Sequence, residues 1–113
     1  MAALGHLSEK DYLAVSKFSR SLREALEGNL EEIRLFGSKA RSDDNWESDI
    51  DFLVIVKHRN AKVDDQILDI AFEISLDFDV FISPVVFSHD EYFAPLARYT
   101  LFFQNTQREG IPL

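Results

Sequence analysis

Residues 36–51 read FGSKARSDDNWESDID, and both the fold and the chemistry of the chain depend on this stretch. Gly37 and Ser38 follow the apolar run Ile33–Phe36, so we expect them at the end of a strand, with a helical turn starting at Lys39. A glycine lets a phosphate approach the backbone closely, and a serine hydroxyl with free backbone N–H groups binds phosphate oxygens at a helix start. The stretch therefore begins with a candidate phosphate-binding turn.

The same stretch ends with two acidic residues, Asp49 and Asp51, at the start of the clearest strand in the chain, Asp49–Val56. Residues i and i+2 of a strand point to the same side, roughly 6–7 Å apart along the chain. Two carboxylates placed in this way repel each other, and a divalent cation relieves the repulsion. Because Mg²⁺ prefers a few carboxylates together with substrate phosphates, this window predicts a metal site beside the phosphate site.

Outward from this window, hydrophobic periodicity predicts the element order α-β-(loop)-β-α-β-α, which is an α/β (α+β) fold. A helix capped by Ser8 precedes the strand Ile33–Phe36 and ends near Gly28. The strand Asp49–Val56 has apolar residues on both faces, which is typical of a strand covered on both sides. The later elements are a helix with an apolar stripe over residues 63–74, a strand Asp79–Phe87 with an edge or bulge at Pro84, and a helical section that starts at Ser88 and ends at Gly110.

Composition narrows the functional classes. The 113 residues carry a formal net charge of −8 at pH 7 and contain no cysteine. A chain this acidic repels phosphate backbones, so direct nucleic-acid binding is not expected. The amino-terminal residues lack the pattern of a signal peptide, and no stretch approaches the ~20 apolar residues of a membrane span. We expect a single cytoplasmic domain over residues 1–113 with no membrane partner.

The stretch Leu35–Val56, LFGSKARSDDNWESDIDFLVIV, resembles the signature of the nucleotidyltransferase superfamily with the polymerase-beta-like fold. Within that superfamily the short chain is similar to the minimal nucleotidyltransferases, many of which are antitoxins paired with a HEPN-domain toxin. The resemblance covers nearly the whole chain and implies a small mixed β-sheet flanked by helices. Ser42 stands where the family often has glycine. The signature is carried by Phe36-Gly37-Ser38-x-Ala40-Arg41 and Ser48-Asp49-Ile50-Asp51, and residues 103–111 are similar to a common ending of these proteins.

The resemblance implies a site with three carboxylates. Asp49 and Asp51 would bridge two Mg²⁺ ions, which in such sites lie ~3.5–4 Å apart. The third carboxylate of the family lies on a neighbouring strand and binds the second ion. Asp79, as the first residue of the strand expected over residues 79–87, matches that position best, and Asp77 is the alternative.

The resemblance also implies how the nucleotide is held. Gly37 and Ser38 would bind the β- and γ-phosphates of ATP. Arg41 lies one helical turn from Ser38 and would add positive charge near the phosphates. Lys39 has the same possible role, and the alternative for both basic residues is a solvated position on the helical turn.

The activity implied by the family is transfer of a nucleoside monophosphate from a nucleoside triphosphate to a hydroxyl. Larger relatives add a domain that holds the acceptor, and 113 residues leave little room for one. The resemblance therefore implies transfer of AMP from ATP to a partner protein, with a tyrosine of a HEPN RNase toxin as the acceptor, so that the chain acts as the antitoxin. Two alternatives remain open: an antitoxin that neutralises its partner by occlusion without catalysis, and a nucleotidyltransferase subunit that modifies a small molecule.

Overall fold

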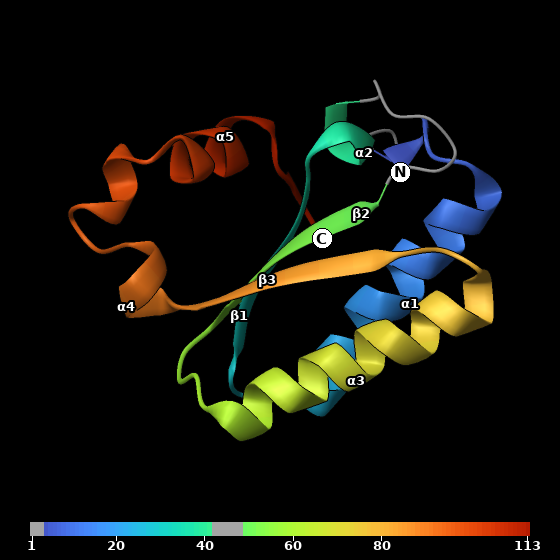
Figure 1. Ribbon diagram of the computed structural model, residues 1–113, viewed down its shortest axis with the longest axis horizontal. Helices are drawn as coiled ribbons and strands as arrows, with labels where there is room; N and C mark the ends of the chain where they lie inside the picture. Colours follow the sequence, from blue (N-terminus) through green and yellow to red (C-terminus); the bar gives the residue numbers. More distant parts are fainter. Residues whose placement is uncertain (1–3, 42–48) are drawn as a thin grey trace.

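The protein is built around a four-stranded mixed sheet with the strand order β3-β2-β1-β4 (Figure 1). The computed structural model describes residues 4–41 and 49–113. In chain order the elements are α1 (Glu9–Ala25), β1 (Leu30–Phe36), α2 (Ser38–Arg41), β2 (Ile50–Val56), α3 (Ala61–Phe78), β3 (Ile82–Ser88), α4 (His89–Tyr92), the 3₁₀ helix η2 (Ala97–Tyr99), α5 (Leu101–Glu109) and β4 (Ile111–Pro112).

The sheet combines two kinds of pairing. β1 lies antiparallel to both β2 and β4, whereas β2 and β3 run parallel. Parallel neighbours need a long crossover, and α3 supplies it between β2 and β3. β3 is an edge strand, which explains how Pro84 is accommodated there, because proline cannot donate a hydrogen bond to a further strand. The α/β fold class, the mixed sheet and the edge position of Pro84 are thus as predicted.

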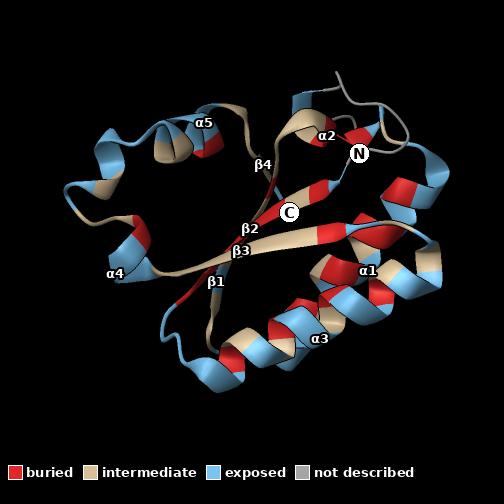
Figure 2. Cartoon of the chain, viewed as in Figure 1, coloured by how far each residue is buried: buried red, intermediate tan, exposed pale blue. Residues whose placement is uncertain are grey.

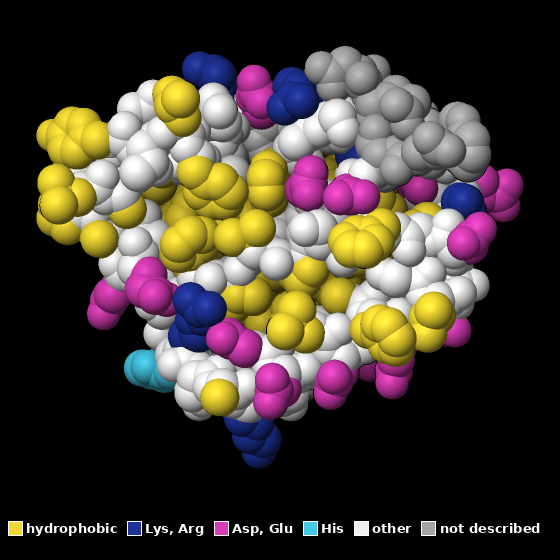
Figure 3. Space-filling model, viewed as in Figure 1, with side chains coloured by type: hydrophobic (Ala, Val, Ile, Leu, Met, Phe, Trp, Pro, Cys, Tyr) yellow, Lys and Arg dark blue, Asp and Glu magenta, His cyan; other side chains and the backbone are white. Residues whose placement is uncertain are grey.

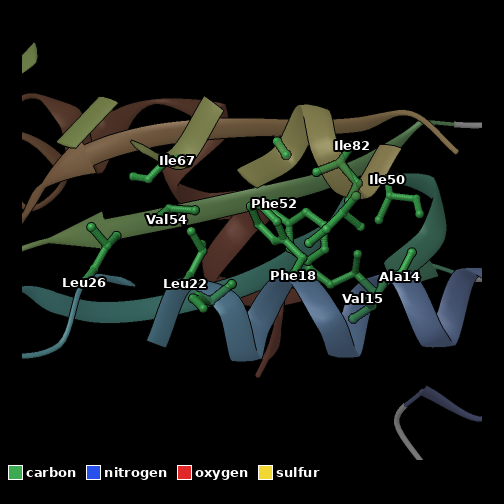
Figure 4. Close-up of a cluster of buried hydrophobic side chains, with 14 of the residues drawn as sticks. Ala14, Val15, Phe18, Leu22, Leu26, Ile50, Phe52, Val54, Ile67 and Ile82 are labelled. Atoms are coloured by element: carbon green, nitrogen blue, oxygen red, sulfur yellow. The ribbon is translucent and has the colours of Figure 1, made fainter. Parts of the chain in front are cut away.

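The two long helices cover one face of the sheet. Ser8 caps α1, since its hydroxyl accepts the backbone N–H of Asp11 at 3.1 Å, and Asn60 caps α3 in the same way. α1 buries Phe18 against Phe52 of β2, with ring centroids 4.5 Å apart. Figure 4 shows this core, in which side chains from α1 and α3 meet the side chains that alternate along β2.

The C-terminal segment covers part of the opposite face. We call α4, η2 and α5 the C-terminal arm. Leu53 and Ile55 of β2 point to this face and pack with Tyr92 of the arm, with further phenylalanines around them. The Tyr92 hydroxyl is hydrogen-bonded to Thr106 of α5, and this contact ties the start of the arm to its end. β2 is therefore buried on both faces, as predicted and as Figure 2 shows.

The structure corrects one predicted element. The strand expected over residues 79–87 begins three residues later, at Ile82, and α3 continues to Phe78. Asp79 is the C-cap of α3, with φ of 52°, and its backbone N–H donates to the Ser75 carbonyl. Asp79 therefore ends a helix and does not open a strand, and Asp77 lies inside the helix. The described ranges also contain no helix with the length and hydropathy needed to cross a membrane.

Candidate functional site

The phosphate-binding turn predicted from the sequence lies at the end of β1. Gly37 has φ of 75°, a left-handed backbone conformation that favours glycine, and its carbonyl accepts the backbone N–H groups of Ala40 and Arg41 to start α2. A Cβ on Gly37 would lie 2.5 Å from Oδ2 of Asp51. The missing side chain thus lets the backbone of the turn lie directly against the Asp51 carboxylate.

Asp49 and Asp51 lie at the amino end of β2, as predicted. Asp49 is exposed immediately before the strand, and Asp51 is half-buried within it. Burial raises the pKa of Asp51 above its ordinary value, and the negative charge of Asp49 raises this pKa further, while the charge of Arg41 opposes the rise. The two carboxylates therefore repel each other in the folded protein.

This pair fits one divalent cation. Mg²⁺ is commonly bound through one or two carboxylates, with substrate phosphates and water completing six-coordination. The raised pKa of Asp51 is the electrostatic cost that a bound cation would relieve. Residues 4–41 and 49–113 contain no group of three or more histidine, cysteine or acidic side chains that could hold a metal, so these residues show no third carboxylate beside the pair.

Ser38 and Arg41 form the two ends of α2. Ser38 is half-buried directly after Gly37, next to the turn, where the prediction placed it. Arg41 is exposed, and its Nη1 lies 3.4 Å from Oε2 of Glu109 in α5. Arg41 is also close enough to Asp51 for its positive charge to lower the pKa of that carboxyl, against the larger effects of burial and Asp49.

A small pocket joins this turn to the C-terminal arm. It has a volume of about 180 Å³ and includes Gly37 and Arg41 on one side and α5 on the other. Two aromatic rings of its wall, Phe36 and Phe102, meet edge to face with centroids 5.4 Å apart.

In Figure 3 hydrophobic side chains gather on both sides of β3, between the arm and α3.

Lys39 fits neither of the two roles considered for it from the sequence, a positive charge near the phosphates or a solvated residue on the helical turn. It is neither solvated nor turned toward a phosphate site, because its side chain is only 1% exposed and its Nζ lies 2.7 Å from Oδ2 of Asp11 in α1. His6 is hydrogen-bonded to the Lys39 carbonyl. Lys39 thus anchors the four-residue helix α2 to the start of α1. Sequence reasoning missed this pair, because nothing in the local pattern links two charges 28 residues apart.

The structure does not bring Asp79 to the carboxylate pair. Asp79 is exposed at the end of α3 and lines a groove with Leu68, Phe72 and Leu76 of that helix. α3 covers the sheet face to which Phe52 points, whereas Asp51 alternates with Phe52 and belongs to the other face. The geometry therefore gives no support to Asp79, or to Asp77 within α3, as the third ligand. The signature residues Ser42 and Ser48 lie outside the described residues.

Comparisons with known proteins show the family of the chain. The family described as the nucleotidyltransferase domain matches residues 15–91. Putative protein adenylyltransferase MJ0141 of Methanocaldococcus jannaschii is 36% identical over 74 residues, which are 65% of this chain and 75% of that protein. The chain belongs to the nucleotidyltransferase family, as its sequence predicted.

Solved structures show the same fold. One described as a putative minimal nucleotidyltransferase has a TM-score of 0.61 and 22% identity, and the match covers 96% of this chain and all of that one. A toxin–antitoxin crystal structure with AMP-PNP has a TM-score of 0.60 and 20% identity, over 86% of this chain and 69% of that one. The fold is therefore that of the minimal nucleotidyltransferases, as predicted.

Proposed function

We propose that this chain is a Mg²⁺-dependent protein adenylyltransferase and an antitoxin. It transfers AMP from ATP to a tyrosine hydroxyl on a partner protein, a HEPN-type RNase toxin, and thereby inactivates it. ATP and divalent cations are available in the cytoplasm, which is where we expect the chain to act. The general reaction, nucleotidyl transfer, follows from the family, whereas the metal, the nucleotide, the partner and the acceptor residue are the proposal.

One observation carries the proposal, which is the contact between Gly37 and Asp51. A Cβ at position 37 would overlap the Asp51 carboxylate, so the backbone of the turn and the metal-binding carboxylate share one small space. A triphosphate bound through the turn would then place its oxygens beside the carboxylate pair. This adjacency is what transfer of a nucleotidyl group requires, because the charge of the phosphates must be neutralised where the reaction occurs.

The residues of the chain have separate tasks in this reaction. Gly37 and Ser38 bind the outer phosphates, and Arg41 adds positive charge on the arm side. Asp49 and Asp51 would hold Mg²⁺, which supplies charge neutralisation on the triphosphate. The acceptor oxygen forms a bond to the α-phosphorus, the bond from that phosphorus to the β-phosphate oxygen breaks, pyrophosphate leaves, and the hydroxyl proton passes to a base.

Two relatives support the choice of substrate and partner. A protein with 36% identity bears the name of a protein adenylyltransferase. A structure with the same fold is a toxin–antitoxin complex with AMP-PNP. The acidic surface of this chain, with a net charge of −8, suits a basic partner such as an RNA-binding toxin.

The test combines the purified chain, the protein encoded next to it, Mg²⁺ and each of the four nucleoside triphosphates, followed by intact-mass spectrometry of both proteins. We expect the partner to gain the mass of one AMP with ATP only, and peptide mapping to find the AMP on a tyrosine. Asp49→Asn with Asp51→Asn should abolish the gain while the fold is retained. A full mass gain in this double variant would refute the assignment of the site.

The structure also favours a second candidate, which is neutralisation by occlusion. Three clustered carboxylates would argue for catalysis, because they repel one another without a metal. The structure groups only Asp49 and Asp51 of the three predicted residues. Tight complex formation with toxin inhibition, but no mass gain on either protein with any nucleotide, would establish this second function.

A further inference from the structure

The strand beside Asp51 determines which residues can share a metal ion with it. In the parallel pairing of β2 and β3, Asp51 is opposite Ser83. Neighbouring strands lie ~4.8 Å apart, and the side chains of paired residues point to the same face. Ser83 is therefore the residue of β3 closest to the carboxylate pair on the face that carries Asp51.

The other residues of β3 near this position are apolar. Val85, the next residue on the same face, is opposite Leu53. Before the strand, the Phe81 carbonyl accepts the backbone N–H of Ile50 at 2.9 Å, which fixes the register where β2 begins. No carboxylate of β3 thus lies beside Asp51.

Asp79 cannot replace Ser83 without a rearrangement of the chain. Its backbone closes the last turn of α3, and its carbonyl accepts a hydrogen bond from Nζ of Lys10 at 3.1 Å. Asp79 lies four positions before Ser83, and one of the three residues between them, Ile82, is buried in the core on the helix-covered face. A shift that moved Asp79 into register would have to unwind the end of α3, which the backbone of Asp79 caps.

We propose that the chain binds one divalent ion per nucleotide, between the triphosphate and the pair Asp49 and Asp51, and that Ser83 is the position at which a carboxylate for a second ion is missing. The inference rests on the proposed function. Two carboxylates with phosphates and water complete the coordination of one Mg²⁺. A second ion close to the first needs further negative charge on its other side, and a serine hydroxyl provides none.

The experiment counts metal ions and does not depend on turnover. Mn²⁺ serves as the probe, together with α,β-methylene-ATP, in which the bond that nucleotidyl transfer breaks is replaced. Equilibrium dialysis gives bound nucleotide, and electron paramagnetic resonance of free Mn²⁺ gives bound metal. We expect one Mn²⁺ per bound nucleotide for the natural chain and two for Ser83→Asp. The affinity for the second Mn²⁺ should be at least tenfold higher in Ser83→Asp than in the natural chain. Ser83→Asn, which matches aspartate in size but lacks the charge, should stay at one.

The outcomes separate this inference from the proposed function. Two ions per nucleotide in the natural chain would overturn the inference and leave the proposed function intact. Nucleotide binding with no Mn²⁺ retained by the protein would overturn both. A count of one for a folded Ser83→Asp variant would show that position 83 is not the missing ligand. If Ser83→Asp does not fold, as judged by circular dichroism, the count for the natural chain still decides between one ion and two.

Discussion

Substitution of Gly37 by alanine tests the contact on which the site depends. A non-glycine residue in the left-handed conformation of Gly37 costs about 1–2 kcal/mol. The added Cβ would also lie 2.5 Å from Oδ2 of Asp51, so the carboxylate has to rotate away. An off-rotamer side chain costs about 0.5–1.5 kcal/mol. Together these effects predict a loss of about 1.5–3.5 kcal/mol in the free energy of unfolding.

Gly28→Ala is a matched control for the backbone effect. Gly28 has φ of 84°, close to that of Gly37, but an added Cβ would have no heavy atom within 4 Å. Gly28→Ala should therefore show only the conformational cost of about 1–2 kcal/mol. Urea denaturation gives the free energy of unfolding of both variants, and we expect Gly37→Ala to lose about 1 kcal/mol more than Gly28→Ala. Mn²⁺ affinity should fall about tenfold in Gly37→Ala, equivalent to about 1.4 kcal/mol, and stay unchanged in Gly28→Ala.

A double-mutant cycle isolates the contribution of Asp51. In an Asp51→Ala background the remaining Cβ of residue 51 is 3.5 Å from a Cβ at position 37, which is an ordinary contact. Gly37→Ala should then cost no more than Gly28→Ala does. Equal losses for Gly37→Ala and Gly28→Ala in the natural background, with Mn²⁺ binding retained in both, would refute the argument that the turn and the carboxylate share one space.

Three further predictions concern charged residues. Because the pKa of Asp51 is raised in the folded protein, protonated Asp51 contributes stability at low pH, and this contribution is lost as the pH rises through the raised pKa. In the presence of a chelator, Asp51→Asn should therefore raise the melting temperature at neutral pH but not below the pKa of the unfolded state. A difference in melting temperature that does not depend on pH would contradict this cause. Lys39→Met leaves Asp11 buried without its partner and should cost about 3–5 kcal/mol in urea denaturation, while Lys39→Met with Asp11→Leu should recover most of the loss. Asp79→Asn keeps a residue type that tolerates the left-handed cap and should leave Mn²⁺ affinity unchanged; a tenfold loss would return Asp79 to the metal site.

Much of the fold could be predicted because local signals mark its elements. The hydroxyl of Ser8 caps α1 and the Ser88–Glu91 capping box starts α4, as expected from short-range patterns. The stretch from Gly37 to Asp51 was informative because a glycine, a serine and two aspartates at fixed spacing have few structural explanations together. Family resemblance then supplied the class of reaction, which the family match confirms.

The start of β3 could not be predicted, for a physical reason. Acidic and apolar residues alternate at the boundary between α3 and β3, where Asp77 and Asp79 are exposed and Phe78 and Val80 are half-buried. Alternation alone does not locate the boundary, and aspartate is one of the few residues that tolerates a left-handed helix cap. An acidic residue at position 79 therefore fits both a helix end and a strand start, and only the register with β2 distinguishes them.

Contacts between residues far apart in the chain could not be predicted from the sequence either. β4 has two residues, Ile111 and Pro112, and it is a strand only because β1 lies beside it. The buried pair of Asp11 and Lys39 likewise depends on the position of α1 against α2. From the sequence alone, each of these charged residues is expected at the surface, and only the packing of the two helices shows that both are buried.

The Asp11–Lys39 pair has a practical consequence for anyone who labels or immobilises this protein. Asp11 belongs to the first turn of α1, so the amino-terminal end of the chain is mechanically coupled to the turn after β1. We therefore expect a fluorophore or fusion placed just ahead of Ser8 to disturb the Asp11–Lys39 contact and, through it, the turn at Gly37. The tip of the C-terminal arm, where Leu96 and Tyr99 are 83% and 80% exposed, is the better point of attachment, because the arm contacts α2 through Glu109 at its other end.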